Sequence, residues 1–322
     1  MVPISQKLQD AAIVYNAAFA EGVEALKQGV DITWPGKTEK VTMPGTEESV
    51  HGFLCEMPLF KKWSGSRDFK RPKTGSYSLK VDLYDVSWSI GRDDLQFDRW
   101  GLLTPTVRGY GVAQARFYED LVTDLQAAGK TTTCFDGQNF YDVDHPQGLD
   151  GSGSIFKNLW TGMAPTIDNI TTVFQYMCQI KDANGKRFGI RPNVFEYGPG
   201  YMNYARLAFN AELIAQAVSQ TGVMDQVSSV VAAASQSNVA PFRGLVTPML
   251  NPNLEDGVWY LHDTRVMKPF LLQEETPPTG LMSMTDLTNP AVFMNREFYF
   301  AAEARAGAGV TLPHLSSRVE EA

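Results

Sequence analysis

The feature of this sequence that most constrains its fold is one long amphipathic helix, which we predict over residues 104–128. Thr104 can cap this helix, Pro105 suits its first turn, and Gly129 ends it. The helix would be roughly 36 Å long, which is typical of a strut with one buried stripe. The apolar stripe, and hence the predicted core of the helix, comprises Val107, Tyr110, Phe117, Leu121 and Leu125. The polar face is expected to tolerate substitution and comprises Arg116, Glu119, Asp120 and Asp124.

Helices and strands follow one another irregularly along the rest of the chain. Apolar periodicity predicts further helices at 5–28, 165–182 and about 200–220. Buried or alternating apolar residues predict strands at 188–198, 257–263, 268–275 and 296–313. The fold class is therefore α+β, because no regular strand–helix–strand alternation of a doubly wound sheet is present.

Residues 61–92 are predicted to form a long, polar β-hairpin that projects from the body. Leu79, Val81 and Leu83 alternate with Lys80, Asp82 and Tyr84, as expected for a strand with two different faces. An isolated ribbon of this kind is marginal in water, so we expect it to lie on another surface. Its candidate contact residues are the basic side chains between positions 67 and 80, which are Arg67, Lys70, Arg71, Lys73 and Lys80.

Composition and charge exclude several classes of protein. With 43% hydrophobic and 20% charged residues, the chain can form a core. A net charge of −8 argues against a surface built to grip nucleic acid. No apolar run reaches the roughly 18–20 residues of a membrane span, and the N-terminus lacks the pattern of a secretory signal. Three scattered cysteines, Cys55, Cys134 and Cys178, fit a reducing compartment without a disulfide framework.

The stretch CFDGQNFYDVDHP, residues 134–146, is the strongest candidate for chemistry. Its possible metal ligands are Asp136, Asp142, Asp144 and His145. The spacing of a calcium loop is not matched, and no second histidine stands at a helical spacing for zinc. Gly137 and Asn139 are turn formers. We therefore favour a structural loop and predict no metal site.

Other kinds of site are also disfavoured. Cys134 and His145 could form a nucleophile pair, but Cys134 is predicted at a strand edge rather than at a helix N-terminus, the position that activates a thiol. No phosphate-binding or nucleophile-elbow pattern occurs. Four tryptophans could form a sugar-binding platform, although Trp88 and Trp100 occupy ordinary core positions. We predict no catalytic residue and no cofactor, and hence no enzyme.

Several strings resemble the major head (major capsid) subunits of Mu-like tailed bacteriophages. They are GFLCEMPLFKKWSGSR at 52–67, SIGRDDL at 89–95, the 134–146 stretch, FGIRP at 188–192, LQEETPP at 272–278 and VFMNREFYFAAEARAGAG at 292–309. The resemblance covers most of the chain from about residue 50, without a clear counterpart in 1–45 and 222–250. It implies the Hong Kong 97-like capsid fold, in which the helix at 104–128 is the spine helix.

This resemblance also implies a domain organisation and a function. The implied parts are an N-terminal arm at 1–60, an extended-loop hairpin at 61–92, a peripheral domain at 93–159 and 271–322, and an axial domain at 160–270. The implied function is a major capsid protein that self-assembles into an icosahedral head shell around packaged double-stranded DNA. The basic hairpin residues would contact a neighbouring acidic subunit.

The implied partners are further copies in hexamers and pentamers, a scaffold or protease, a portal and decoration proteins. DNA would be enclosed without sequence-specific binding, and no membrane is involved. The implied location is the virion capsid, assembled in the cytoplasm of the bacterial host. Two alternatives remain: an encapsulin-type nanocompartment shell, and a soluble metal-dependent hydrolase that uses Asp136 and His145.

Overall fold

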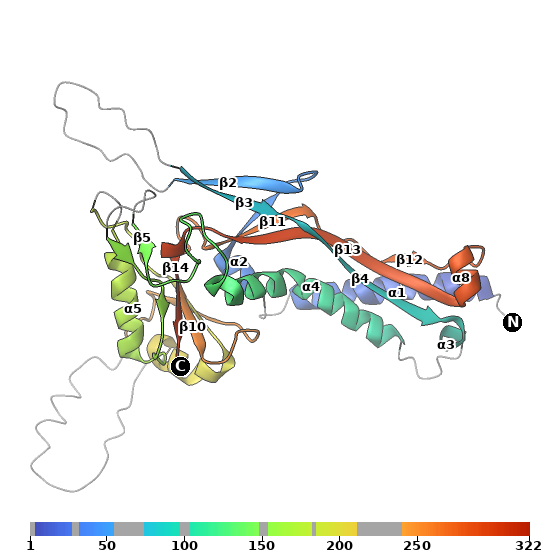
Figure 1. Cartoon of the computed structure of the whole chain (residues 1–322). Coiled ribbons are helices and arrows are strands. Elements are labelled where there is room, and N and C mark those ends of the chain that lie inside the picture. Colours follow the sequence, from blue (N-terminus) through green and yellow to red (C-terminus); the bar gives the residue numbers. More distant parts are fainter. Residues whose placement is uncertain are drawn as a thin grey trace, which may run out of the picture. The chain divides into compact units, whose positions relative to one another are not determined.

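The computed structural model describes residues 4–27, 32–54, 74–96, 103–147, 154–181, 185–210 and 240–322 (Figure 1). The chain divides into two compact units. Unit 1 comprises Met1–Phe53, Thr74–Ala128 and Phe270–Thr311, and unit 2 comprises Leu54–Lys73, Gly129–Pro269 and Leu312–Ala322. No helix within the described ranges is long and apolar enough to cross a membrane. Each unit combines helices with a mixed sheet, so the predicted α+β class is confirmed.

Unit 1 is built on a long sheet. The strand order is β1 (Thr38–Thr42), β11 (Phe270–Thr276), β13 (Glu297–Val310) and β12 (Met282–Met284), and β4 (Asp82–Gly91) pairs with β13. Strand β1 is parallel to β11, and the other pairs are antiparallel. The short helix α8 (Pro290–Asn295) connects β12 to β13, while α2 (Trp34–Lys37) directly precedes β1 and α3 (Arg92–Gln96) directly follows β4.

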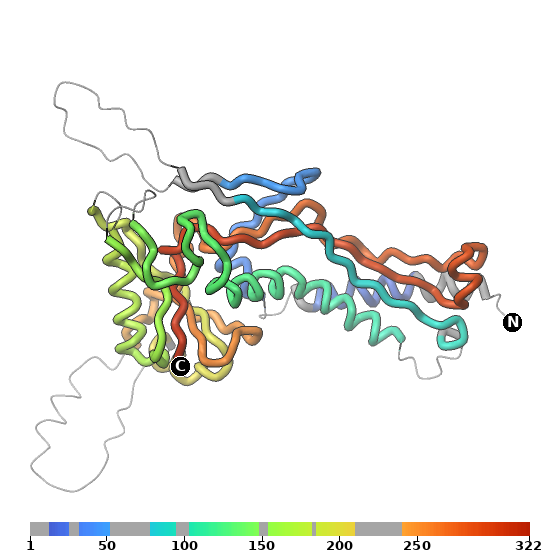
Figure 2. The backbone as a smooth tube through the Cα atoms, viewed as in Figure 1, coloured from blue at the N-terminus to red at the C-terminus, as the bar shows by residue number. Residues whose placement is uncertain are grey.

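Two long helices, α1 (Ile4–Lys27) and α4 (Leu103–Ala127), run beside one another along the sheet of unit 1 (Figures 1 and 2). Tyr15 and Phe19 of α1 are buried against aromatic residues of the sheet, where Phe19 stacks on Trp88. A Cβ at Gly22 would lie 2.2 Å from the Arg108 carbonyl oxygen, and one at Gly111 would lie 2.2 Å from that of Phe19. The absence of a side chain at both glycines therefore lets the helices touch backbone to backbone.

Unit 2 contains a second sheet, in the order β7 (Leu159–Trp160), β14 (Ser316–Glu320), β10 (Val258–His262), β8 (Val194–Tyr197) and β9 (Thr247–Leu250). Helix α5 (Ile167–Gln179) is capped by the Thr166 hydroxyl, which accepts a hydrogen bond from the Asn169 amide. Its apolar face packs on the sheet, with Ile170 and Phe195 fully buried. The remaining elements are β5 (His145–Pro146), β6 (Ile155–Phe156), α6 (Met202–Ala205) and the short helical turns Ala128–Lys130, Pro199–Tyr201, Arg206–Asn210 and Pro313–Leu315.

The structure divides the chain differently from the predicted domains. Residues 312–322 were expected in the peripheral domain with 271–311, yet β14 pairs with β10 and β7 in the sheet of unit 2. Residues 129–159 also fold with unit 2, although the prediction placed them with the long helix. Both differences arise from strand pairing between distant segments, which local sequence patterns do not encode.

The predicted hairpin at 61–92 also has different strands. Its described arms are β2 (Glu48–Leu54) and β3 (Thr74–Lys80), while β4 belongs to the long sheet. Between β3 and β4, the Val81 amide donates to the Glu47 carbonyl at 2.9 Å, and the alternation shifts there. Leu83 was predicted to share a face with Val81, but it is 56% exposed while Val81 is buried.

Candidate functional site: the 134–146 loop and the long helix

The 134–146 loop forms a tight turn that is held by its own backbone. Gly137 has a φ of +86°, a left-handed conformation that favours glycine. The Cys134 amide donates to the Gln138 carbonyl at 2.7 Å, and the Gln138 amide donates to Asp136 Oδ1 at 3.1 Å. Cys134 is 5% exposed, which leaves its thiol poorly accessible to a substrate. These contacts make the segment a turn whose geometry is fixed locally.

Of the predicted metal ligands, the loop brings only Asp136 and His145 into contact. Asp136 Oδ2 lies 2.7 Å from His145 Nδ1, and both side chains are buried. The Asp142 carboxylate accepts a hydrogen bond from the neighbouring Val143 amide, and Asp144 is exposed. Among the described residues, no three His, Cys, Asp or Glu side chains are placed to hold a metal ion.

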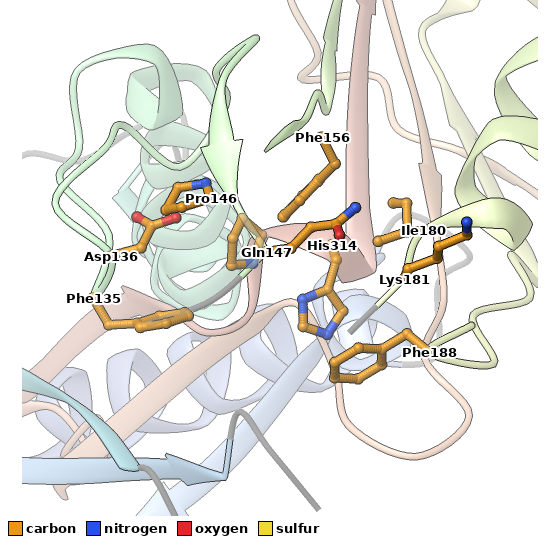
Figure 3. A pocket seen from close by; sticks show the side chains of 10 residues that line it. Phe135, Asp136, Pro146, Gln147, Phe156, Ile180, Lys181, Phe188 and His314 are labelled. Atoms are coloured by element: carbon orange, nitrogen blue, oxygen red, sulfur yellow. The ribbon is translucent and has the colours of Figure 1, made fainter. Parts of the chain in front are cut away.

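A small cavity beside this loop is lined by aromatic and polar side chains (Figure 3). His314 lies between Phe156 and Phe188, with ring centroids 6.3 Å and 4.1 Å away. Burial, with a smaller contribution from His145, lowers the pKa of His314 to about 3, so its imidazole is neutral at pH 7. The cavity volume of about 30 Å³ matches a water molecule and is far below that of a substrate pocket.

Asn158 ties the loop to the C-terminal segment of unit 2. Its Nδ2 donates to the carbonyls of Phe140 at 2.7 Å and Pro313 at 2.9 Å, while its Oδ1 accepts from the Asp142 amide at 2.8 Å. Phe140 is fully buried. These bonds tie the loop into unit 2, and its purely structural role stays a prediction.

A buried polar chain that sequence reasoning missed crosses the sheet of unit 2. His262 Nδ1 lies 3.0 Å from Ser316 Oγ, and His262 Nε2 lies 3.0 Å from Glu196 Oε2. Asn251 donates to the other Glu196 oxygen at 2.7 Å. The residue types match a Ser–His–Glu catalytic triad, but the three side chains are fully buried and no substrate reaches them. Their partners lie on separate strands, so no spacing in the sequence predicts the chain.

Arg318 forms a second buried polar cluster in unit 2. It is 2% exposed and donates to Glu255 at 2.5 Å, Glu320 at 2.8 Å and the Tyr260 hydroxyl at 2.8 Å. Burial raises the pKa of the Tyr260 hydroxyl well above its usual value, so it remains a neutral acceptor. The arginine thus has a partner for each nitrogen, which is the condition for burying a charge.

The predicted helix at 104–128 is α4, which starts and ends one residue earlier. Of its predicted core, Val107 is buried, and Tyr110, Phe117, Leu121 and Leu125 are half-buried. Tyr110 stacks on Trp88 at 4.4 Å, and Phe117 meets Tyr84 at 4.9 Å, so this stripe faces β4. The fully buried positions of α4 are Val107, Gly111, Glu119, Val122, Thr123 and Gln126. Most of these lie on a second face that the apolar pattern did not reveal.

Glu119 corrects the predicted polar face of the helix. We expected it in solvent with Asp120 and Asp124, but it is 1% exposed. Its carboxylate accepts hydrogen bonds from the amides of Thr33 at 2.7 Å and Trp34 at 2.8 Å, and from the Thr33 hydroxyl. These amides belong to the first turn of α2, where an acceptor is needed. Glu119 therefore anchors the segment after α1 to the long helix.

The predicted contact residues Arg67, Lys70, Arg71 and Lys73 lie outside the described residues. Lys80 ends β3 and is exposed, with its Nζ 3.9 Å from Glu47 Oε1. Exposed ion pairs of this length contribute little to stability. Lys80 is thus accessible, and its contact with another subunit remains a prediction.

The fold is that of phage capsid proteins. The chain aligns with a protein of the procapsid of bacteriophage JBD30 at a TM-score of 0.54 and 19% identity, covering 100% of this chain and 77% of that one. It aligns with a protein of the capsid of cyanophage P-SCSP1u at a TM-score of 0.56 and 10% identity, covering 91% of this chain and 89% of that one. The arrangement is Hong Kong 97-like, which confirms the fold implied by the resemblance.

The chain belongs to the Mu-like prophage major head subunit gpT family, whose sequence profile matches residues 8–166 and 244–322. It is 31% identical over 125 residues to the major capsid protein of Escherichia phage Mu. This alignment covers 37% of this chain and 41% of that protein. It is 30% identical over 114 residues to the Mu-like prophage FluMu major head subunit of Haemophilus influenzae, covering 35% and 37%. These alignments span about two fifths of each relative.

Proposed function

We propose that this chain is a major capsid protein that self-assembles into the icosahedral head shell of a tailed phage and encloses double-stranded DNA. The observation that carries this proposal is the family match, which includes both ends of α4, the 134–146 loop and the C-terminal strands. The fold shared with the JBD30 and P-SCSP1u capsid proteins supports it.

The chemistry of the chain supports a structural rather than an enzymatic role. The loop with the most reactive side chains is a bonded turn beside a cavity the size of one water molecule. The Ser316–His262–Glu196 chain is sealed inside unit 2. A net charge of −8 suits a wall that encloses DNA without gripping it, because phosphate repels a negative surface.

The finer parts of the proposal concern partners and location. Copies of the chain would form the hexamers and pentamers of a shell in the virion, assembled in the cytoplasm of the bacterial host. A scaffold or protease, a portal and decoration proteins would act with it, and a JBD30 capsid is itself described as decorated with minor capsid protein trimers. The basic hairpin residues Arg67, Lys70, Arg71, Lys73 and Lys80 would contact neighbouring copies.

Electron microscopy of the purified chain, expressed alone and with candidate scaffold proteins, tests the proposal. We expect closed particles of uniform diameter that sediment far faster than a 35.6 kDa subunit. A monomer that never forms closed particles, under any of these conditions, would contradict a shell function.

A further inference from the structure

Unit 2 carries a group of exposed basic side chains at the C-terminal end of α5. They come from the segment that follows this helix and from the loop after β10, and we call this surface the basic patch. Its members are Lys181, Lys186, Arg187, Arg191 and Arg265. Burial raises the pKa of the Cys178 thiol in the last turn of α5, and the three arginines of the patch all oppose this shift. The arginines therefore lie close to the same end of the helix.

Backbone pairing brings the members of the patch onto one surface. Lys181 and Arg187 face one another in an antiparallel bridge, although they are six positions apart. The Arg191 amide donates to Asp263 Oδ2 at 2.8 Å, which joins this segment to the loop after β10. The charges of the two segments are therefore side by side, although about 75 positions separate Arg191 from Arg265.

One arginine of the patch already has a carboxylate partner within the subunit. Arg265 donates through Nε to Asp263 Oδ1 at 2.9 Å and through Nη2 to Oδ2 at 2.8 Å. Burial opposes the ionisation of Asp263, but the hydrogen bonds from Arg265 and from backbone amides outweigh it and lower the pKa of the carboxyl. By contrast, Lys181, Arg187 and Arg191 form no ion pair with any residue that the structure describes. Three charges of the patch are thus available to an external anion.

The charge of the patch is opposite to that of the chain as a whole. The stretch IKDANGKRFGIR, residues 180–191, contains four basic residues and one acidic residue, Asp182, which lies outside the described residues. With Arg265 and Asp263 included, the patch has a local excess of three positive charges, in a chain with a net charge of −8. A positive surface on an acidic protein attracts polyanions, and its contribution weakens as salt rises.

The composition of the patch suits phosphate better than a protein surface. Its exposed apolar side chains in the described segments are Phe188, 38% exposed, and Val266, 91% exposed. The Phe188 ring centroid lies 4.1 Å from that of His314, so one ring face is already covered (Figure 3). A protein interface has an apolar centre from which charged residues are depleted. A phosphate backbone instead needs lysine and arginine, whose planar guanidinium can bind two phosphate oxygens at once.

We propose that the basic patch contacts the phosphate backbone of the enclosed double-stranded DNA, and that unit 2 turns this patch toward the interior of the shell. This inference rests on the proposed function as a shell subunit, and it names the surface that touches the genome. Lys181, Arg187 and Arg191 each approach a phosphate, while Arg265 stays paired with Asp263. A few such contacts in each subunit are weak and independent of sequence, so they position the outer DNA without preventing its exit.

Binding of a short fluorescent DNA duplex to the unassembled full-length chain tests the contact in solution. Fluorescence anisotropy at several salt concentrations gives the affinity and its dependence on salt. Arg187→Gln with Arg191→Gln removes two of the proposed phosphate contacts. We expect this variant to bind at least about tenfold more weakly at low salt, and the slope of log affinity against log salt to become shallower by about 1.8. A parent chain that does not bind the duplex would overturn the inference.

A charge-matched control separates the patch from the overall charge of the chain. Arg108→Gln with Arg305→Gln removes two exposed arginines from unit 1. We expect this control to change the affinity for the duplex by less than about twofold. Both variant chains should melt like the parent, because the substituted side chains are exposed. An equal loss of affinity in the patch variant and the control would overturn the inference.

Particle assembly distinguishes DNA from an acidic protein surface as the partner of the patch. We expect the Arg187→Gln with Arg191→Gln variant to form particles at the rate of the parent, because the proposed contact is with DNA. Loss of assembly in this variant would assign the patch to a contact between copies and overturn the inference.

A cryo-electron microscopy map of DNA-filled particles locates the patch directly. We expect duplex density of the outermost DNA layer next to Arg187 and Arg191. A patch on the outer surface, or one covered by another copy, would overturn the inference while leaving the shell function intact. If the unaltered chain forms no closed particles, the proposed shell function fails, and the duplex measurements still decide whether the patch binds phosphate.

Discussion

Two groups of acidic side chains in this chain are built in opposite ways. In unit 2, Glu196 pairs with His262. Glu320 pairs with both Arg318 and Lys130. In unit 1, Asp85, Asp120, Asp124 and Glu303 line an open groove between α4, β4 and β13, here called the acidic groove, which no described lysine or arginine lines. The difference teaches that the first group has its partners within the subunit, whereas the second group is open to solvent. The stability of the subunit should therefore depend on the first group much more than on the second.

The largest expected effect is the loss of unit 2 stability in acid. The pKa of His314 falls from its ordinary 6.5 to about 3 because the ring is buried, with His145 adding to the shift and Asp263 and Asp136 opposing it. Between these values the unfolded chain binds a proton that the folded unit excludes. Stability is thus complete above pH 6.5 and is lost as pH falls toward 3, by up to about 5 kcal/mol. His314→Gln should flatten this dependence in urea melts at several pH values, relative to the parent chain.

The next effect concerns the self-completed carboxylates. Glu196→Ala leaves His262 and Asn251 buried without their acceptor, so we expect the free energy of unfolding to fall by about 3–5 kcal/mol. Glu303→Ala in the acidic groove should change it by less than about 0.5 kcal/mol. Urea melts of the unassembled subunit measure both. An equal loss in the free energy of unfolding for the two variants would contradict the contrast between the two groups of carboxylates.

Helix α4 carries the same contrast on its two faces. Its face toward α1 is closed, so Gly111→Ala should destabilise the subunit by about 1–3 kcal/mol, because the new Cβ meets the Phe19 carbonyl. Gly109→Ala on the same helix meets nothing within 4 Å and should stabilise it by up to about 1 kcal/mol. Thermal melts of the two variants should therefore shift in opposite directions. A shift in the same direction would mean that α1 does not pack there.

The smallest effect on the subunit is expected on the open face. Val122 is fully buried, so Val122→Ala should lower the free energy of unfolding by about 2 kcal/mol. Leu121 is half-buried, so Leu121→Ala should lower it by about 1 kcal/mol. Calorimetry of the two variant subunits measures both effects. A larger stability cost at Leu121 would place it in a closed core.

Much of this fold can be predicted from local sequence, and the exceptions have physical causes. The limits of α4 and the strands β10, β11 and β13 follow from apolar periodicity and from Pro and Gly signals. The prediction placed Glu119 in solvent, because a charged residue on a helix is usually exposed. Only the structure shows that the amides at the start of α2 donate hydrogen bonds to its carboxylate. The partners of β14 could not be predicted, because they are set by pairing across the whole chain.

The basic segment at 61–73 and the acidic groove differ in whether the sequence alone reveals them. The basic segment is visible in the sequence because its charges are consecutive. The acidic groove is not, because its lining comes from three elements and its Asp and Glu residues are about 200 positions apart at the extremes. The basic segment could therefore be recognised from the sequence, whereas the acidic groove could be recognised only from the structure.

A cryo-electron microscopy map of assembled particles tests the central claim most directly. The account predicts closed shells built from copies of this chain, in each of which α4 packs on β4 through Tyr110 and on α1 at Gly111. Particles that never close, or subunits in which α4 lies away from β4 and α1, would contradict it.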